Sequence, residues 1–326
     1  MELVTKKRLM LVSGRAHRPL AEKIAGKLGI QLSEPNIAAF SNGELHCRYS
    51  ESVRGCDMFI VQTHSGFDGG SINDAMVEHL IMVDAARRAS AKRITVVCPY
   101  FGYARQDRKS EGREPISAKM MADLFKSAGA SRMISLDLHS GQIQGFFQGP
   151  WDHLTAMPVL MGALRDLGDD LVVVSPDAGR VKVSERYANA LGADLAIVHK
   201  RRIKGEKNKV EAKEVVGEVE GRVCVLIDDM IDTGGTIVAA AEVLIARGAK
   251  SVIAATTHPV LSGPAMQRLN DSVIERVIVT DTLPLPKNAD LSKIEVVSVS
   301  GVLADAINAV FEDASVSDIF GGTNLS

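Results

Sequence analysis

The sequence predicts an α/β fold of two similar domains, each a mainly parallel sheet flanked by helices. Short β-branched runs alternate with segments of helical periodicity along almost all of its 326 residues. The runs are continuously apolar, which is typical of parallel strands that helices cover on both faces. A weak similarity between two segments suggests that the two domains are a duplicated unit. "RGCDMFIVQT" at 54–63 and "EGRVCVLIDD" at 220–229 each lead into a glycine-containing loop and a helix.

Each element of this prediction depends on its own segment of the chain. The apolar runs predict strands at 9–12, 58–62, 94–98, 133–138, 171–174, 195–198, 223–227, 252–255 and 295–299. Apolar residues at helical spacing predict helices at 72–90 and 236–249. The segment "QGPWDHLTAMP" at 148–158 is the expected domain boundary. The similarity between the two segments has an alternative explanation: they could be two ordinary strand–helix–strand units built from residues of the same secondary-structure propensities.

Composition and charge exclude several classes of protein. The chain is 46% hydrophobic and 24% charged, with a formal net charge of −2, so its bulk electrostatics do not favour nucleic acid. The four cysteines show no CxxC spacing, which argues against a zinc site and a disulfide framework. No apolar segment is long enough for a signal peptide or a membrane span, so the expected location is the cytoplasm.

One acidic, glycine-containing stretch carries the main chemical signal. "VLIDDMIDTGGT" at 225–236 ends an apolar run in Asp228 and Asp229, adds Asp232, and continues through two glycines to Thr236. We expect residues 228 onward to lie between strand and helix, where backbone N–H groups and a helix N-terminus hold phosphate. No lysine precedes Thr236, so this is not a Walker A loop. The carboxylates would then accept hydrogen bonds from hydroxyls, which predicts a pentose phosphate ligand; the alternative is a tight turn with an acidic cap.

This stretch resembles the phosphoribosyl-pyrophosphate-binding motif of type I phosphoribosyltransferases and ribose-phosphate pyrophosphokinases. Four further stretches resemble the second family, and specifically its phosphate-activated class. They are "FSNGE" at 40–44, "YFGYARQDRK" at 100–109, "SLDLHSGQIQGFF" at 135–147 and "VVSPDAG" at 173–179. Together with the acidic stretch they follow the family's order over nearly the whole chain.

The resemblance implies an enzyme that moves the diphosphoryl group of ATP to the 1-hydroxyl of ribose 5-phosphate, giving 5-phosphoribosyl 1-diphosphate and AMP for nucleotide biosynthesis. It implies Mg²⁺ as cofactor and a homo-oligomer, expected to be a hexamer. Each domain would have the type I phosphoribosyltransferase fold. The first would cover 1–155 with the tail 310–326 packed on it, and the second would cover 156–309.

The resemblance also assigns residues to ATP and the metal. The ATP-binding candidates are Phe40, Asn42, Glu44, Arg105 and Gln106. The metal-binding candidates are His139 and Asp177, although Mg²⁺ prefers oxygen ligands. Each assignment has a plainer alternative: a turn for 41–43, a solvated basic loop for 104–109, and a structural histidine at a strand end for His139.

The sugar and the chemical step receive a further set of residues by resemblance. The ribose 5-phosphate candidates are Arg202, Asp228, Asp232, Thr233, Gly234, Gly235 and Thr236. The segment at 200–213 is very basic. By resemblance it matches a catalytic lid in the family, and Lys200 and Arg202 match the functional residues of that lid. Cations that close over a transferring phosphoryl group would stabilise its charge. The plainer alternative is an exposed mobile loop.

Regulation is also expected from the resemblance, with inorganic phosphate as activator and ADP as inhibitor. The matches to the effector site are Ser52, Arg54, Arg113, Ser315 and Ser317. Gly141 departs from this pattern, since some relatives have serine there. Arg180 stands where relatives often have a second glycine, and the loop at 63–74 is longer than in many relatives. The alternative is a set of unrelated surface arginines and a fraying tail.

Two other functions compete with this interpretation. The first is a phosphoribosyltransferase that uses 5-phosphoribosyl 1-diphosphate as substrate, which AMP formation from ATP would exclude. The second is a non-catalytic regulatory homologue of the synthase. Such homologues tend to lose lid or metal residues, whereas Lys200, Arg202, His139 and Asp177 are all present.

Overall fold

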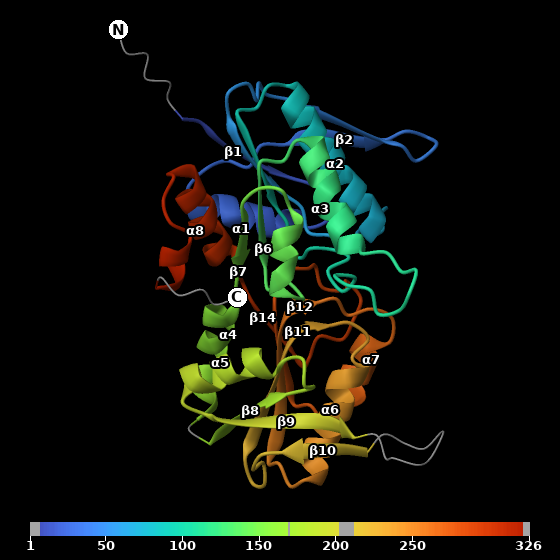
Figure 1. The fold of residues 1–326 in the computed structure, drawn as a ribbon, viewed down its shortest axis with the longest axis vertical. Coiled ribbons are helices and arrows are strands. Elements are labelled where there is room, and N and C mark those ends of the chain that lie inside the picture. Colours follow the sequence, from blue (N-terminus) through green and yellow to red (C-terminus); the bar gives the residue numbers. More distant parts are fainter. Residues whose placement is uncertain (1–6, 169, 202–211, 322–326) are drawn as a thin grey trace. The chain divides into compact units, whose positions relative to one another are not determined.

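The computed structural model describes residues 7–168, 170–201 and 212–321 and divides the chain into two compact units (Figure 1). Unit 1 contains Met1–Thr155, Thr282–Pro284 and Val299–Ser326, and unit 2 contains Ala156–Asp281 and Leu285–Ser298.

The core of unit 1 is a five-stranded, wholly parallel sheet. Its strands, in spatial order, are β1 (Leu9–Ser13), β4 (Asp57–Val61), β5 (Arg93–Val97), β6 (Arg132–Leu136) and β7 (Trp151–Leu154). A separate antiparallel hairpin joins β2 (Pro35–Ala39) to β3 (Leu45–Tyr49). β4 is buried along its whole length, which explains its uninterrupted apolar sequence.

Helices cover both faces of the unit 1 sheet. α2 (Ile72–Arg88) and α3 (Ser117–Ala128) pack Met82 and Phe125 into one core cluster with strand residues such as Met58. α1 (Arg18–Leu28) packs against α8 (Ser300–Phe311), and Figure 1 shows both on the other side of the sheet. Two 3-10 helices, η1 (Gly141–Phe146) and η3 (Ser317–Phe320), complete the helical elements described for this unit.

Unit 2 is a seven-stranded sheet whose neighbours are parallel except at one edge. Its strands, in spatial order, are β10 (Ala212–Val216), β9 (Asp194–Arg201), β8 (Leu171–Ser175), β11 (Val223–Ile231), β12 (Ser251–Pro259), β13 (Arg276–Thr280) and β14 (Ile294–Val297). β10 pairs antiparallel with β9. The chain runs from β8 outward to β9, and β11 then begins on the other side of β8, so the strand order reverses between β8 and β11.

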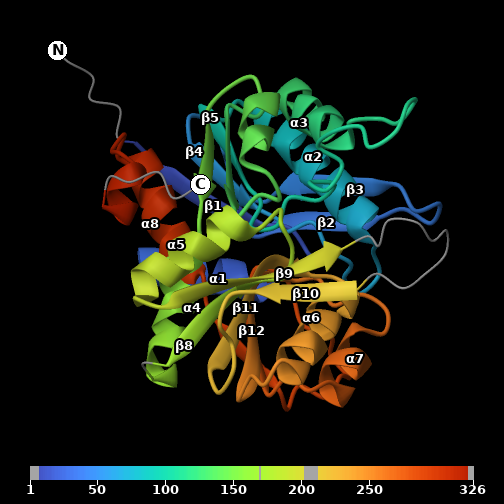
Figure 2. The same cartoon turned by 60° about the horizontal axis from the view of Figure 1, so that its bottom comes forward.

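The helices of unit 2 also lie on both faces of its sheet (Figure 2). They are α4 (Met157–Leu164), the 3-10 helix η2 (Arg165–Leu167), α5 (Val181–Leu191), α6 (Gly235–Ala246) and α7 (Ala265–Asp271). α6 and α7 share a core cluster with alternate strand residues, among them Val174, Leu226 and Ala254. α4 contacts α5 and the strands β12 to β14 from the opposite face.

The predicted fold class is confirmed, and the nine predicted strands exist with small shifts at their ends. One shift affects the candidate site: the strand expected at 223–227 continues to Ile231, so Asp228 and Asp229 lie within β11 and not in the loop after it. The helices predicted at 72–90 and 236–249 end at Arg88 and Ala246. In the described part of the chain, every helix is too short or too polar to cross a membrane.

Candidate active site

Two acidic segments meet where the strand order of unit 2 reverses. β8 is followed by Asp177, and the neighbouring β11 carries Asp228 and Asp229 near its carboxyl end. In open α/β sheets, ligands bind at such a reversal, outside the carboxyl ends of the strands. Asp177 is exposed, and one of its carboxylate oxygens, Oδ1, accepts a hydrogen bond from the backbone N–H of Gly179 at 2.8 Å. The geometry therefore brings Asp177 and the acidic strand end to one edge of the sheet.

The N-terminus of α6 lies directly after this acidic strand end and is suited to an anion. Its N-cap is Gly234, no side chain caps it, and no acidic residue lies in its first turn. Gly234 has a φ of 76°, a left-handed conformation that favours glycine. The Thr233 and Thr236 side chains are exposed next to it, and Arg268 binds the Thr233 carbonyl oxygen at 3.0 Å. Helix dipole and N–H groups together favour phosphate at this position.

Arg180 joins the two halves of this site. It is the N-cap of α5, and its guanidinium lies 2.5 Å from the Asp229 carboxylate (Nη2 to Oδ2) and 3.4 Å from that of Asp228 (Nε to Oδ1). Oδ1 of Asp228 also accepts a hydrogen bond from the backbone N–H of Asp229 at 2.8 Å. Burial, and secondly the charge of Asp229, raise the pKa of Asp228 to about 8, while Arg180 lowers it. In the sequence alone, Arg180 stands out only as a departure from the family pattern.

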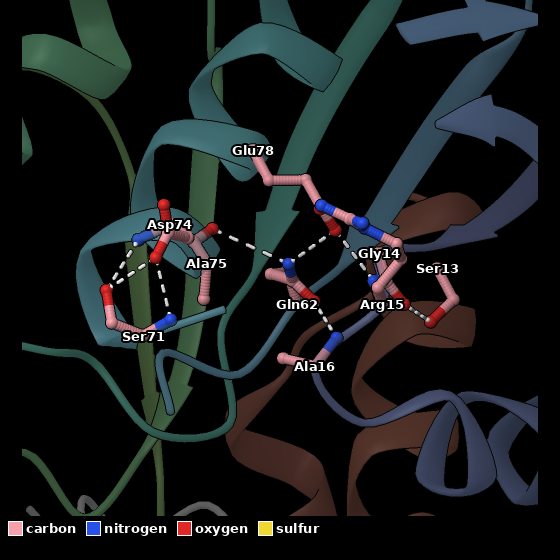
Figure 3. Close-up of polar contacts among 9 residues, drawn as sticks. All are labelled: Ser13, Gly14, Arg15, Ala16, Gln62, Ser71, Asp74, Ala75 and Glu78. Atoms are coloured by element: carbon pink, nitrogen blue, oxygen red, sulfur yellow. Dashed lines mark hydrogen bonds and ion pairs between the residues drawn. The ribbon is translucent and has the colours of Figure 1, made fainter. Parts of the chain in front are cut away.

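Unit 1 contains a similar strand–loop–helix segment, from β4 to α2. In unit 1, however, side chains of the protein itself accept the hydrogen bonds of the N–H groups (Figure 3). The N-terminus of α2 is closed by a capping box, in which Asp74 accepts the Ser71 N–H at 2.7 Å and Ser71 Oγ accepts the Asp74 N–H. A carboxylate of the protein therefore occupies the place that a phosphate would take at α6.

A second internal contact fills the loop after β1. Glu78 accepts the Arg15 backbone N–H at 2.7 Å and its side-chain Nε–H at 2.6 Å, and Gln62 accepts the Ala16 N–H at 3.1 Å (Figure 3). Gly14 makes this possible, since a Cβ there would lie 2.4 Å from the Gln62 side chain. Unit 1 thus uses these N–H donors for its own stability, and the sugar-phosphate candidates belong to unit 2.

The adenine candidates lie on the turn of the β2–β3 hairpin in unit 1. Phe40 and Glu44 close the turn by a backbone hydrogen bond of 2.8 Å, and the Asn42 side chain accepts the Glu44 N–H at 3.2 Å. The Phe40 ring is 58% exposed and meets His46 edge-on at 6.0 Å between ring centroids. An exposed aromatic ring with an amide and a carboxylate beside it provides the groups that an adenine base needs, although the same residues also form an ordinary turn.

The other ATP candidates lie on the loop between β5 and α3. Arg105 is exposed, and Gln106 is anchored to the start of α3 because Ser117 Oγ donates to its Oε1 at 2.6 Å. The loop is also held by a buried relay: the Gly102 N–H donates to His64 Nδ1 at 3.0 Å, His64 contacts His79 at 3.2 Å, and His79 contacts the Ile60 carbonyl oxygen at 3.1 Å.

This relay requires both histidines to be neutral. Since Gly102 donates to Nδ1 of His64, the proton of that ring lies on Nε2 and faces His79, whose own proton then faces Ile60. Burial lowers the pKa of His79 to about 3 and lowers that of His64 well below its usual range, so neither ring charges near neutral pH. Sequence analysis missed both residues because their partners are distant in the chain.

The remaining catalytic and metal candidates have different positions. His139 is half-buried just after β6 in unit 1, whereas Asp177 belongs to unit 2. The backbone of Lys200 lies in β9, paired with Lys213 of β10. Arg202 and most of the basic segment lie outside the described residues.

The described residues fit a Mg²⁺ ion that is bound jointly by protein carboxylates, substrate phosphates and water. Among the described residues, no three His, Cys, Asp or Glu side chains form a cluster that could hold a metal by itself. Mg²⁺ is usually bound by one or two carboxylates together with substrate phosphates and water, which does not require such a cluster. The exposed carboxylate of Asp177 is suited to this role.

The effector candidates are all exposed in unit 1. Ser315 Oγ lies 3.3 Å from Ser317 Oγ, and the Ser52 carbonyl oxygen accepts a hydrogen bond from Arg8 at 3.3 Å. Arg113 has a positive φ of 70° on the loop before α3. These contacts do not test whether the five residues form an effector site, so that site stays a prediction.

Comparisons with known proteins identify the family. The N-terminal domain of ribose phosphate pyrophosphokinase matches residues 9–129, and the phosphoribosyl synthetase-associated domain matches residues 206–321. The ribose-phosphate pyrophosphokinases of Streptomyces avermitilis and Corynebacterium glutamicum are 54% and 51% identical to this chain, and each match covers 97% of both chains. The chain belongs to the ribose-phosphate pyrophosphokinase family.

The fold agrees with this membership. A crystal structure of phosphoribosylpyrophosphate synthetase from Mycobacterium smegmatis is 48% identical, covers 94% of this chain and 100% of its own, and superposes with a TM-score of 0.88. Membership of the ribose-phosphate pyrophosphokinase family does not depend on the short acidic motif alone, because the similarity extends over both units.

Proposed function

We propose that this chain is a ribose-phosphate diphosphokinase, which converts ATP and ribose 5-phosphate into AMP and 5-phosphoribosyl 1-diphosphate. The observation that carries the proposal is the uncapped N-terminus of α6 directly after the acidic end of β11. A ligand with a phosphate and several hydroxyls satisfies both features at once. The names of relatives about 50% identical over nearly the whole chain support the same reaction.

In the proposed sugar site, the residues of unit 2 have distinct tasks. The 5-phosphate binds the loop of Asp232, Thr233, Gly234, Gly235 and Thr236 at the start of α6. Asp228, on the strand before it, accepts hydrogen bonds from ring hydroxyls and so fixes the orientation of the sugar. The phosphate and the hydroxyl contacts together select a pentose phosphate over free ribose.

In the proposed ATP site, the residues of unit 1 have complementary tasks. Phe40, Asn42 and Glu44 bind the adenine, and Arg105 with Gln106 binds the phosphates. The 1-hydroxyl oxygen of the sugar attacks the β-phosphorus of ATP and loses its proton to solvent, the bond from that phosphorus to the α–β bridging oxygen breaks, and AMP leaves. Lys200 and Arg202 are the proposed cations that stabilise charge on the transferring group.

His139 and Asp177 are the proposed protein ligands of Mg²⁺, which would neutralise the charge of the phosphates when it is bound. Asp177 supplies the type of oxygen donor that this ion prefers. A histidine contact is unusual for Mg²⁺ and is consistent with binding through a water molecule.

The finer properties of the family are also proposals for this chain. Inorganic phosphate activates it through Ser52, Arg54, Arg113, Ser315 and Ser317, ADP inhibits partly by competition there, and the enzyme is a cytoplasmic hexamer. Two arginines with several hydroxyls form a plausible anion site. Activity measured against phosphate concentration, together with the mass from light scattering, tests this: a fully active monomer that is indifferent to phosphate would exclude both claims.

The reaction itself is tested by following the purified protein with ATP, Mg²⁺ and ribose 5-phosphate. AMP and 5-phosphoribosyl 1-diphosphate should appear in equal amounts. A phosphoribosyltransferase would consume added 5-phosphoribosyl 1-diphosphate with a base and form no AMP from ATP, and a non-catalytic homologue would do neither.

A further inference from the structure

We infer that Arg180 is a positioning residue of the sugar site: it neutralises Asp229 and thereby lets the neighbouring Asp228 serve as the acceptor for ribose hydroxyls. The inference deepens the proposed function and rests on it. It follows from the placement of one guanidinium against two adjacent carboxylates at the strand-order reversal of unit 2.

The two acids differ in their distance from Arg180 and in their exposure to solvent. Arg180 binds Asp229 tightly, at 2.5 Å, and approaches Asp228 more loosely, at 3.4 Å. The side chains of Arg180 and Asp229 are only 13% and 7% exposed, whereas that of Asp228 is 17% exposed. The more deeply buried acid therefore has the closer ion pair with Arg180, and Asp228 is the more exposed of the two.

The electrostatics explain why the pair of acids needs a cation. Two like charges on consecutive residues with little solvent repel each other, and their ionisation is opposed by burial. The Arg180 guanidinium lies against both carboxylates, and it counteracts the rise in the pKa of Asp228. Removing its charge leaves two buried acids facing each other, a situation that is far more unfavourable than losing an exposed ion pair.

The local position of Arg180 supports a role outside its own helix. It is the N-cap of α5, and Lys182 follows in the first turn, where no acidic residue is present. Cations at a helix N-terminus oppose the helix dipole, so Arg180 does not favour α5. The side chain instead connects the segment after β8 to the end of β11, the two places from which the site is built.

Kinetics of Arg180 variants test this role. In Arg180→Met, which keeps the aliphatic stem, KM for ribose 5-phosphate should rise about tenfold while KM for ATP stays within about twofold. Arg180→Lys keeps the charge and should recover most of this loss, to within about threefold of wild type. Melting temperatures of all variants are measured in parallel, and Arg180→Gln replaces the methionine variant if the latter does not fold.

The decisive comparison is a double-mutant cycle with Asp229→Asn. If Arg180 acts by neutralising Asp229, then Arg180→Met should cost at most about threefold in KM for ribose 5-phosphate when residue 229 is already neutral. Independent, multiplicative effects of the two changes would overturn the inference. So would an unchanged or lowered KM for ribose 5-phosphate in Arg180→Met, the latter meaning that the arginine competes with the sugar.

This outcome is distinguishable from failure of the proposed function. Calorimetric titration of the wild-type protein with ribose 5-phosphate should show binding, and the wild type should form AMP. If it does neither, the proposed function fails before any variant is compared. If it does both and the Arg180 variants behave like wild type, the function stands and the inference fails.

Discussion

Replacement of Asp228 by asparagine should weaken the binding of ribose 5-phosphate without destabilising the protein. The change keeps the shape of the side chain and the acceptor for the Asp229 N–H at 2.8 Å, but removes the charge. A hydrogen bond to a charged group contributes about 1.5–3 kcal/mol and a neutral one about 0.5–1.5. The difference of about 1–2 kcal/mol predicts a rise in KM for ribose 5-phosphate of roughly 5- to 30-fold above about pH 8, where Asp228 is ionised, and a smaller rise at lower pH.

Stability should change in the opposite direction, which separates this effect from misfolding. Burial raises the folded-state pKa of Asp228 from 3.8 to about 8, so the folded protein binds more protons than the unfolded chain between these values. Ionisation of this group therefore destabilises the fold increasingly as pH rises from about 4 to about 8, and not below. Asp228→Asn removes that penalty, so its melting temperature at about pH 8 should equal or exceed that of the wild type.

The assay couples AMP release to a spectrophotometric readout while each substrate is varied in turn, with melting curves across the same pH range. In the wild type, KM for ribose 5-phosphate should fall as pH rises through the pKa of Asp228, and in Asp228→Asn this dependence should disappear. An equal rise in KM for ATP, or a lower melting temperature of the variant, would refute the reasoning, because either result indicates a metal-binding or structural role.

Three other substitutions test separate parts of the account. Lys200→Ala should lower kcat by several orders of magnitude at an unchanged melting temperature, and kinetics within about threefold of wild type would remove Lys200 from catalysis. Gly234→Ala, at a φ of 76°, should cost about 1–2 kcal/mol of stability and raise KM for ribose 5-phosphate. An unchanged KM would mean that the α6 N-terminus does not hold the phosphate. Arg93→Met removes the partner of Asp57, which is only 3% exposed, and should lower the free energy of unfolding by about 1–3 kcal/mol, since Arg93 itself is partly solvated. Adding Asp57→Asn should restore part of it, and denaturant unfolding that shows no such recovery contradicts the pairing.

The elements that the sequence predicted well are those whose environment is uniform. β4 and β8 are buried at every position, so their apolar runs mark them clearly. The hairpin of β2 and β3 escaped prediction because its residues alternate between exposed and half-buried positions and its sequence is mixed. Such strands lack the continuous apolar signal on which the other predictions rested.

The end of β11 was mispredicted for a different reason. Two adjacent acids usually indicate the end of a buried strand, yet Asp228 and Asp229 lie within β11, and Asp228 is paired with Thr256 of β12. Arg180, distant in sequence, supplies the neutralising charge that makes this possible. Local sequence patterns contain no signal for an ion pair between the start of α5 and the end of β11, because the two segments are distant in the chain.

The candidate site was predictable to the extent that it consists of contiguous motifs. The loop at Asp232 to Thr236 is marked by its residue types, and Asp177 by its resemblance to the family; both stay predictions as ligand-binding residues. The His64–His79 relay under the Arg105 loop, and the internal contacts of Glu78 and Gln62, depend on packing between distant segments. Such contacts become visible only in the folded chain.

The most direct test of the central claim is the identity of the nucleotide product formed from ATP in the presence of ribose 5-phosphate. Chromatography of the reaction mixture should show AMP in a one-to-one ratio with 5-phosphoribosyl 1-diphosphate, no ADP, and no AMP when ribose 5-phosphate is omitted. Formation of ADP would indicate transfer of a single phosphoryl group, and AMP formed independently of the sugar would indicate hydrolysis; either result would contradict diphosphoryl transfer by this chain.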